Sequence, residues 1–122
     1  MCNENLAIYS GNDDQILPIL SLGGLGVISV LSNIIPKDVN KIIREFFDGN
    51  INVAKKLQLQ ATPLIKALFS ETNPIPIKYA LSLIGYDVGI PRLPLIEMSQ
   101  TGKEVLKKEL EMYFSNHNSS VK

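Results

Sequence analysis

Short apolar runs separated by polar residues and glycines dominate the first thirty or so positions of the chain. The run from Leu6 to Tyr9 is strand-like, and the run from Gly26 to Leu31 is β-branched and continuously apolar. The second pattern is typical of a strand buried on both faces of a parallel sheet. Between the two runs, a short helix is predicted that starts with Asn12 or Asp13 as its N-cap and ends at a pair of glycines. A strand, a helix and a strand this close together predict a βαβ unit.

From Pro36 onward, the apolar residues recur with a period of about 3.6, which is typical of amphipathic helices. The pattern predicts helices over residues 36–48, 51–69, 77–85 and 100–114. Pro63 is expected to bend the second helix, in which Gln58 is among the side chains expected to face water. Ser99 or Thr101 is the expected N-cap of the last helix. The intervening GIPRLPL is too rich in proline to be helical.

The elements taken together predict an α/β beginning followed by helices. A parallel sheet of only two strands would have open edges and an apolar face with too little to cover it. The first third of the chain is therefore interpreted as part of a larger α/β fold.

Composition narrows the possible functions without selecting one. The 122 residues carry 12 basic and 12 acidic side chains, so the formal net charge is zero and nucleic acid is an unexpected partner. No apolar run reaches the ~18 to 20 residues of a membrane span, so no membrane association is expected and the cytoplasm is the expected location. Cys2 and His117 are too few to form a structural zinc site, and no metal is expected.

Small and polar residues follow both predicted strands, at the end where α/β folds bind ligands. They are Ser10, Gly11, Asn12 and Asp13 after the first strand, and Ser32 and Asn33 after the second. Gly11 would allow close approach of a ligand to the backbone, and the amides that follow it would favour an anion. The alternative is that Gly11 only makes a turn and Asp13 only caps a helix.

Several runs resemble a known family in their order and spacing. IYSGNDDQILPILSLGGLGVISVLSNIIP resembles the seventh and eighth βα units of the dihydrodipicolinate synthase (4-hydroxy-tetrahydrodipicolinate synthase) family. ETNPIPIKYAL and RLPL resemble its C-terminal helical domain. The resemblance extends from about Leu6 to Tyr113. The related N-acetylneuraminate lyases, in the same class I aldolase superfamily, usually lack the SGNDD and NPIPIK motifs.

The resemblance implies a domain organisation. Residues 1–49 would form strands 7 and 8 of a (β/α)8 TIM barrel with their helices. Residues 50–115 would form a C-terminal three-helix domain, and residues 116–122 a disordered tail. The family's barrel is commonly part of a homo-oligomer.

The resemblance also implies an activity and a site. The family condenses pyruvate with aspartate semialdehyde in lysine (diaminopimelate) biosynthesis, through a Schiff base between a lysine and pyruvate and without a cofactor. By resemblance, Gly11 and Ile28 line the pyruvate pocket. The supporting residues would be Ser10, Asp13, Ser29 and Asn33.

One departure from the family decides what the chain can do alone. The resemblance starts after the sixth strand, where the family carries the Schiff-base lysine, so that lysine is expected to be absent. The ten lysines of the chain lie on predicted helices or at their ends, apart from Lys78 in NPIPIK and the terminal Lys122, and none has the context of a desolvated strand end. The chain is therefore expected to be inactive by itself. The alternative is a non-enzymatic helical interaction module, or a half-barrel that associates with itself or with a separate N-terminal piece.

Overall fold

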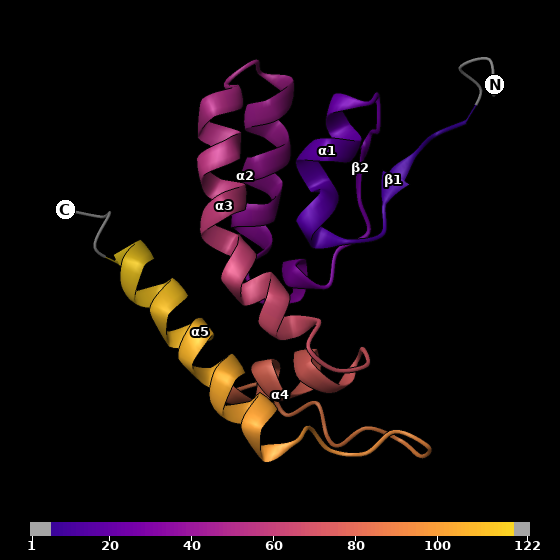
Figure 1. The fold of residues 1–122 in the computed structure, drawn as a ribbon, viewed down its shortest axis with the longest axis vertical. Helices are drawn as coiled ribbons and strands as arrows, with labels where there is room; N and C mark the ends of the chain where they lie inside the picture. Colours follow the sequence, from indigo (N-terminus) through magenta and orange to yellow (C-terminus); the bar gives the residue numbers. More distant parts are fainter. Residues whose placement is uncertain (1–5, 119–122) are drawn as a thin grey trace. The chain divides into compact units, whose positions relative to one another are not determined.

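The computed structural model describes residues 6–118 (Figure 1). Its regular elements are β1 (Tyr9–Ser10), α1 (Ile16–Ser21), β2 (Gly26–Val27), α2 (Pro36–Phe47), α3 (Ile51–Leu68), α4 (Ile75–Leu83) and α5 (Gln100–Asn118). Two short 3-10 turns, η1 (Asp13–Gln15) and η2 (Leu31–Asn33), follow the two strands. The chain divides into two compact units, Met1–Leu59 and Gln60–Lys122, and the division falls inside α3.

The first unit is built on a parallel pair of strands joined by α1. Tyr9 pairs with Gly26 and Ser10 with Val27. The ladder continues by one bond at each end, because the amide of Leu25 donates to the carbonyl of Ile8 and the amide of Ile28 donates to the carbonyl of Ser10, each at 2.8 Å. The predicted βαβ unit is present, and the α1 crossover packs against β2 and α2.

A pair of glycines ends α1 in the way the sequence predicts. Gly23 has a φ of 94°, a left-handed conformation that glycine adopts without strain. The amide of Gly24 donates to the carbonyl of Ile19 at 2.9 Å, and that of Gly23 to Leu20 at 3.0 Å. These two bonds form a Schellman motif that satisfies the last carbonyls of the helix.

The predicted second strand is much shorter in the structure than in the sequence pattern. Only Gly26 and Val27 are strand residues, Ile28 is 75% exposed, and Leu31 belongs to η2. A strand is buried on both faces only where neighbouring strands and helices cover it, and the described residues supply one neighbouring strand. The prediction of a long buried strand was therefore wrong for this chain. Exposed apolar side chains are the result, and on and beside the strand pair they are Leu6, Ile8, Tyr9, Leu25 and Ile28.

The second unit is helical, as predicted. Its buried side chains come from the end of α3, from α4, from the segment before α5 and from α5 itself. They are Ala61, Leu64, Ile65, Ala67, Leu68, Ile75, Ile77, Ala80, Met98, Leu106, Leu110 and Tyr113. The segment between α4 and α5 contains no helix, in agreement with its proline content. Ser99 caps α5, because its Oγ accepts a hydrogen bond from the amide of Gly102 at 3.1 Å. Of the two predicted caps, Ser99 is the one used.

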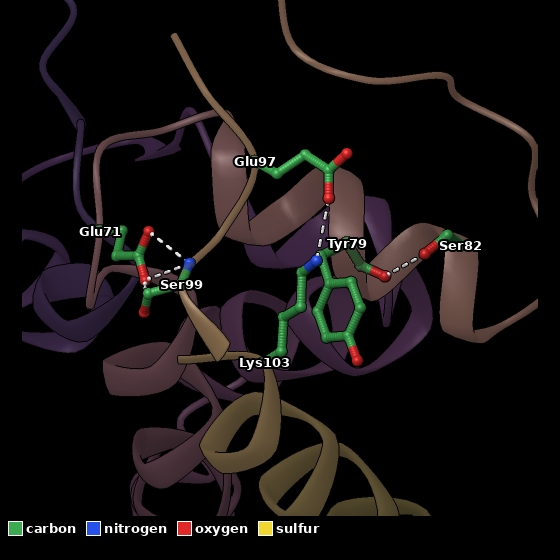
Figure 2. A network of polar contacts seen from close by, with 6 residues as sticks. All are labelled: Glu71, Tyr79, Ser82, Glu97, Ser99 and Lys103. Carbon is green, nitrogen blue, oxygen red and sulfur yellow. Dashed lines mark hydrogen bonds and ion pairs between the residues drawn. The ribbon is translucent and has the colours of Figure 1, made fainter. Parts of the chain in front are cut away.

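A network of polar contacts holds the segment before α5 (Figure 2). The carboxylate of Glu71 accepts hydrogen bonds from the Oγ of Ser99 at 2.6 Å and from its amide at 3.2 Å. The Nζ of Lys103 lies 3.0 Å from the Oε2 of Glu97 and 5.6 Å from the centre of the Tyr79 ring. We refer to these five residues as the Glu71 network.

Two sequence predictions about boundaries differ from the structure. The predicted domain boundary lies between residues 49 and 50, in the turn before α3, whereas the compact units divide between 59 and 60. The predicted disordered tail began at residue 116, but α5 continues to Asn118 because no glycine or proline stops it there. His117 is thus helical, and residues 119–122 and Cys2 lie outside the described residues. Among the helices that the structure describes, none is both long and apolar enough to span a membrane.

Candidate functional site

The carboxyl ends of β1 and β2 bring the two predicted pocket residues to the same edge of the strand pair. Gly11 follows β1 directly, and Ile28 follows β2 directly. The bond from the amide of Ile28 to the carbonyl of Ser10 joins the two strands at this edge. Both residues are exposed, so the edge presents an open stretch of backbone at Gly11 beside an apolar side chain at Ile28.

Gly11 is not required by the turn in which it lies. Its φ is not among the positive values that favour glycine, and a Cβ built on it would meet no atom within 4 Å. Of the two alternatives that the sequence left open, the turn requirement is therefore unsupported. The open space in front of Gly11 leaves its backbone accessible to a small ligand.

Ser10 holds the turn that contains Gly11. Its side chain is almost fully buried. The Oγ of Ser10 donates to the carbonyl of Asn12 at 2.8 Å and accepts from the amide of Asn12 at 3.2 Å. Two bonds from one hydroxyl fix the backbone on both sides of Gly11.

Asp13 has a different role from the helix cap that the sequence predicted. Asn12 occupies the N-cap position of η1, without a capping bond from its side chain. The carboxylate of Asp13 is fully buried and accepts hydrogen bonds from the amides of Val30 and Leu31, each at 3.0 Å, and from the Oγ of Ser29. Asp13 thus satisfies the amides at the start of η2, which lie 17 and 18 residues further along the chain.

Ser29 and Asn33 both support η2, in different ways. The Oγ of Ser29 donates to Asp13 and accepts from the amide of Ser32 at 2.8 Å, so it connects the carboxylate to the turn. The Nδ2 of Asn33 donates to the carbonyl of Val30 at 3.0 Å within the same turn. Asn33 is exposed, and its side chain bonds to the N-cap residue of its own turn. We refer to Asp13, Ser29, Val30 and Leu31 as the Asp13 network.

Gln58 is a member of this region that the sequence analysis missed. Expected to face water, it is instead 7% exposed, and its Nε2 donates to the backbone carbonyl of Asp13 at 2.9 Å. The signal was present in the spacing, because Gln58 lies four residues after the buried Ala54 and three before the buried Ala61. A polar residue on a buried stripe indicates a buried hydrogen-bond partner.

The other candidate chemistry of the described residues is sparse. Nine of the ten lysines are described, all of them on helices, and none is buried. Lys78 donates from its Nζ to the carbonyl of Ile90 at 3.1 Å. Within residues 6–118, no group of three or more His, Cys, Asp or Glu side chains is arranged to hold a metal ion.

Comparison with known proteins identifies the family of the chain. The model of the dihydrodipicolinate synthetase family matches residues 1–113. The chain belongs to this family. A similar member is the 4-hydroxy-tetrahydrodipicolinate synthase of Caldicellulosiruptor saccharolyticus, which is 54% identical over 116 residues, or 95% of this chain and 39% of that protein. The synthase of Clostridium tetani is 50% identical over 117 residues, and the match covers 38% of it.

Solved structures of family members agree with this assignment. The dihydrodipicolinate synthase of Thermotoga maritima matches with a TM-score of 0.86 and 42% identity, over 88% of this chain and 37% of that one. That of Aquifex aeolicus matches with a TM-score of 0.87 and 39% identity, over 91% and 38%. The chain therefore spans less than two fifths of the length of these relatives. Its fold corresponds to the last two βα units of the family's TIM barrel followed by the C-terminal helical domain, as the sequence resemblance implied.

Proposed function

We propose that this chain supplies the C-terminal part of a lyase that condenses pyruvate with aspartate semialdehyde in lysine biosynthesis. The relatives it matches carry the name 4-hydroxy-tetrahydrodipicolinate synthase. The observation that carries the proposal is the position of Gly11 and Ile28, side by side at the carboxyl ends of two paired parallel strands and both exposed. In the proposed enzyme, which we expect to be a cytoplasmic homo-oligomer, these residues form one wall of the pyruvate pocket.

Each of the two residues suits a different part of pyruvate. The open backbone at Gly11 lets the small keto acid approach closely, because no side chain occupies the space in front of it. Ile28 offers an apolar surface beside the carbon that becomes the imine, and such a surface limits access of water to a reactive intermediate.

Among the lysines that the structure describes, none is placed to serve as the amine that the reaction needs. A Schiff-base lysine is activated by desolvation or by a neighbouring cation, at a position where its Nζ reaches the keto carbon. The nine described lysines lie on helices and are exposed or partly exposed, away from the ends of β1 and β2 in sequence. We therefore propose that the lysine comes from a polypeptide portion beyond this chain, and that the chain is inactive by itself.

A complementation experiment tests this proposal. The 122-residue chain is assayed for condensation alone and together with the portion of the Caldicellulosiruptor saccharolyticus synthase that precedes the matched 116 residues. Borohydride trapping with pyruvate and intact mass then identifies which polypeptide carries the adduct. We expect turnover only in the mixture, with the adduct on the added portion. A pyruvate adduct on the 122-residue chain, assayed by itself or in the mixture, would contradict the proposal. A mixture in which the two portions form a complex but show no turnover would also contradict it.

The substitution Gly11→Ala in the active mixture tests the pocket assignment. The free energy of unfolding of the chain should change by less than about 0.5 kcal/mol, because the added Cβ meets no atom within 4 Å and φ is not left-handed. Condensation should fall about 10-fold or more, because the methyl group enters the space proposed for pyruvate. Unchanged turnover in this variant would remove Gly11 from the pocket.

A second candidate function rests on the exposed apolar side chains of the strand pair. A half-barrel that pairs with a second copy of itself would also cover Leu6, Ile8, Tyr9, Leu25 and Ile28. Light scattering of the chain with and without the added synthase portion separates the two candidates. A homo-oligomer that the added portion does not dissociate would favour the non-enzymatic half-barrel.

A further inference from the structure

Asp13 connects two segments that the strand ladder alone holds weakly. It belongs to the segment after β1, yet its carboxylate bonds to the segment after β2, at the side chain of Ser29 and at the amides of Val30 and Leu31. The two strands that lead into these segments have only two residues each. The ladder therefore contributes few hydrogen bonds at this edge, and the Asp13 network adds three.

The two proposed pocket residues lie between the ladder and the network. Gly11 is flanked by Ser10, whose carbonyl accepts the amide of Ile28 at 2.8 Å, and by Asn12 and Asp13. Ile28 precedes Ser29 directly in the chain. On one side of Gly11 and Ile28, the two segments are joined by the bond between Ser10 and Ile28. On the other side, they are joined by the bonds of Asp13 to Ser29, Val30 and Leu31. The separation between the backbone at Gly11 and the side chain at Ile28 is fixed by these two links together.

Because the carboxylate of Asp13 is buried, its hydrogen bonds favour a single position of residues 29–31 relative to it. A fully buried carboxylate is stable only when its oxygens are hydrogen-bonded, and bonds from N–H and O–H groups to a charged acceptor are among the stronger ones. A shift of the segment 29–31 would leave a buried charge with too few donors. The backbone of Asp13 is held in turn, because its carbonyl accepts the side-chain amide of Gln58.

We propose that Asp13 is a positioning residue of the pyruvate pocket, which sets the separation of Gly11 and Ile28 by tying the segment after β1 to the amides of η2. This inference rests on the proposed function, since it concerns the same pocket. Asp13 itself is buried behind the edge and does not contact the substrate in this proposal.

The first test examines the link in the 122-residue chain without any substrate. Asp13→Asn keeps the shape of the side chain but removes its charge, and Asp14→Asn makes the same change at the exposed neighbouring residue. Amide hydrogen exchange of Val30 and Leu31 should become about 10-fold faster or more in Asp13→Asn and stay unchanged in Asp14→Asn. The amides of α5 should keep their rates in both variants. Unchanged exchange at residues 30 and 31 in Asp13→Asn would overturn the proposal.

The second test uses the active mixture described above and separates positioning from stability. A residue that only stabilises the fold changes the amount of folded enzyme, and hence the maximal rate, but leaves KM unchanged. A positioning residue of the pyruvate pocket changes KM for pyruvate. In Asp13→Asn, KM for pyruvate should rise about 10-fold while KM for aspartate semialdehyde stays within about twofold, and Asp14→Asn should match the unmodified chain. An unchanged KM for pyruvate with a lowered maximal rate would reduce Asp13 to a structural role.

A milder variant keeps the test informative if Asp13→Asn does not fold. Ser29→Ala removes one donor to the carboxylate and the acceptor of the Ser32 amide, and it leaves the amides of Val30 and Leu31 in place. It should raise KM for pyruvate in the same direction by about 2- to 5-fold, and a KM equal to that of the unmodified chain would count against the link. Inactivity of the unmodified mixture would be a failure of the proposed function, whereas the exchange rates of residues 30 and 31 decide on the Asp13 link independently of it.

Discussion

The Asp13 network of the first unit and the Glu71 network of the second use the same chemistry in different surroundings. In each, one carboxylate accepts a serine hydroxyl and a backbone amide from a segment distant in sequence. Asp13 is fully buried, whereas the bonds of Glu71 to Ser99 are exposed to solvent. Water can replace the partners of Glu71 and cannot replace those of Asp13. Hydrogen bonds of similar length should therefore differ severalfold in their contribution to stability.

The largest effect is expected from Asp13→Ala. This change leaves the amides of Val30 and Leu31 and the hydroxyl of Ser29 without their acceptor inside the protein. The free energy of unfolding should fall by about 3 kcal/mol, since each buried unsatisfied group costs roughly 1 to 3 kcal/mol and water can enter part of the space. Urea denaturation followed by circular dichroism measures the change, with Asp14→Ala as the matched control. A loss below 1 kcal/mol would contradict the expectation that the buried Asp13 network stabilises the chain more than the exposed Glu71 network does.

An intermediate effect is expected from Ser99→Ala. It removes the cap of α5 together with the stronger bond to Glu71. The loss should be about 1 kcal/mol, the usual value for an N-cap, because solvent satisfies the groups that are released. Thr101→Ala is the control, since Thr101 is the predicted cap that the structure does not use. If Ser99→Ala destabilised the chain as much as Asp13→Ala, exposure would not explain the difference.

A smaller effect is expected from Gly102→Ala, which tests how readily the exposed Glu71 network yields to an added methyl group. A Cβ at this position would lie 2.5 Å from the Oε1 of Glu71, 2.9 Å from the Cε of Met98 and 3.0 Å from the Oγ of Ser99. The exposed network must therefore open, and the end of the Met98 side chain must shift. Alanine within a helix gains up to about 1 kcal/mol over glycine, which offsets much of the loss. The melting temperature should therefore change by only a few degrees. A change of more than 10 degrees would indicate that the Glu71 network is far more rigid than its exposure suggests.

The smallest effect is expected from Lys103→Met, which removes the ion pair with Glu97 and the contact of the ammonium with Tyr79. Exposed ion pairs contribute about 0 to 1 kcal/mol, and salt screens them. The difference in unfolding free energy between the variant and the unmodified chain should be below about 0.5 kcal/mol and should shrink further in 1 M salt. A difference that salt does not reduce would point to packing of the lysine stem instead of charge.

The helices could be predicted from the sequence because their signals are local. The apolar stripe of α2, the glycines after α1 and the serine before α5 each specify an element through neighbours within one or two turns. Both strands were predicted too long, because the length of a strand depends on partners elsewhere in the chain or outside it. The first was predicted over Leu6–Tyr9, whereas β1 is Tyr9–Ser10 and shares only Tyr9 with the prediction. Ile28 illustrates this. The apolar run around it predicts a buried strand, but its side chain is exposed in the structure.

The candidate site was predicted in part, and for the same reason. Gly11 was a candidate from its place after the first predicted strand, by the general rule for α/β folds. Ile28, and the assignment of both residues to a pyruvate pocket, came from the family resemblance. The role of Asp13 could not be predicted, because its partners are 16 to 18 residues away and aspartate before a helix normally indicates a local cap. Gln58 is still more distant, at 45 residues from the carbonyl it bonds.

The brevity of α1 has a consequence for cooperativity. A helix of six residues has too few internal hydrogen bonds to persist in water, since isolated helices need about 12 to 15 residues to become even marginally stable. The crossover can therefore form only together with the strand pair and α2, against which it packs. A synthetic peptide covering residues 6–33 should show no helical circular dichroism, although it contains every residue of the βαβ unit. The smallest autonomous piece of this protein that holds Gly11 and Ile28 in register must extend at least through α2.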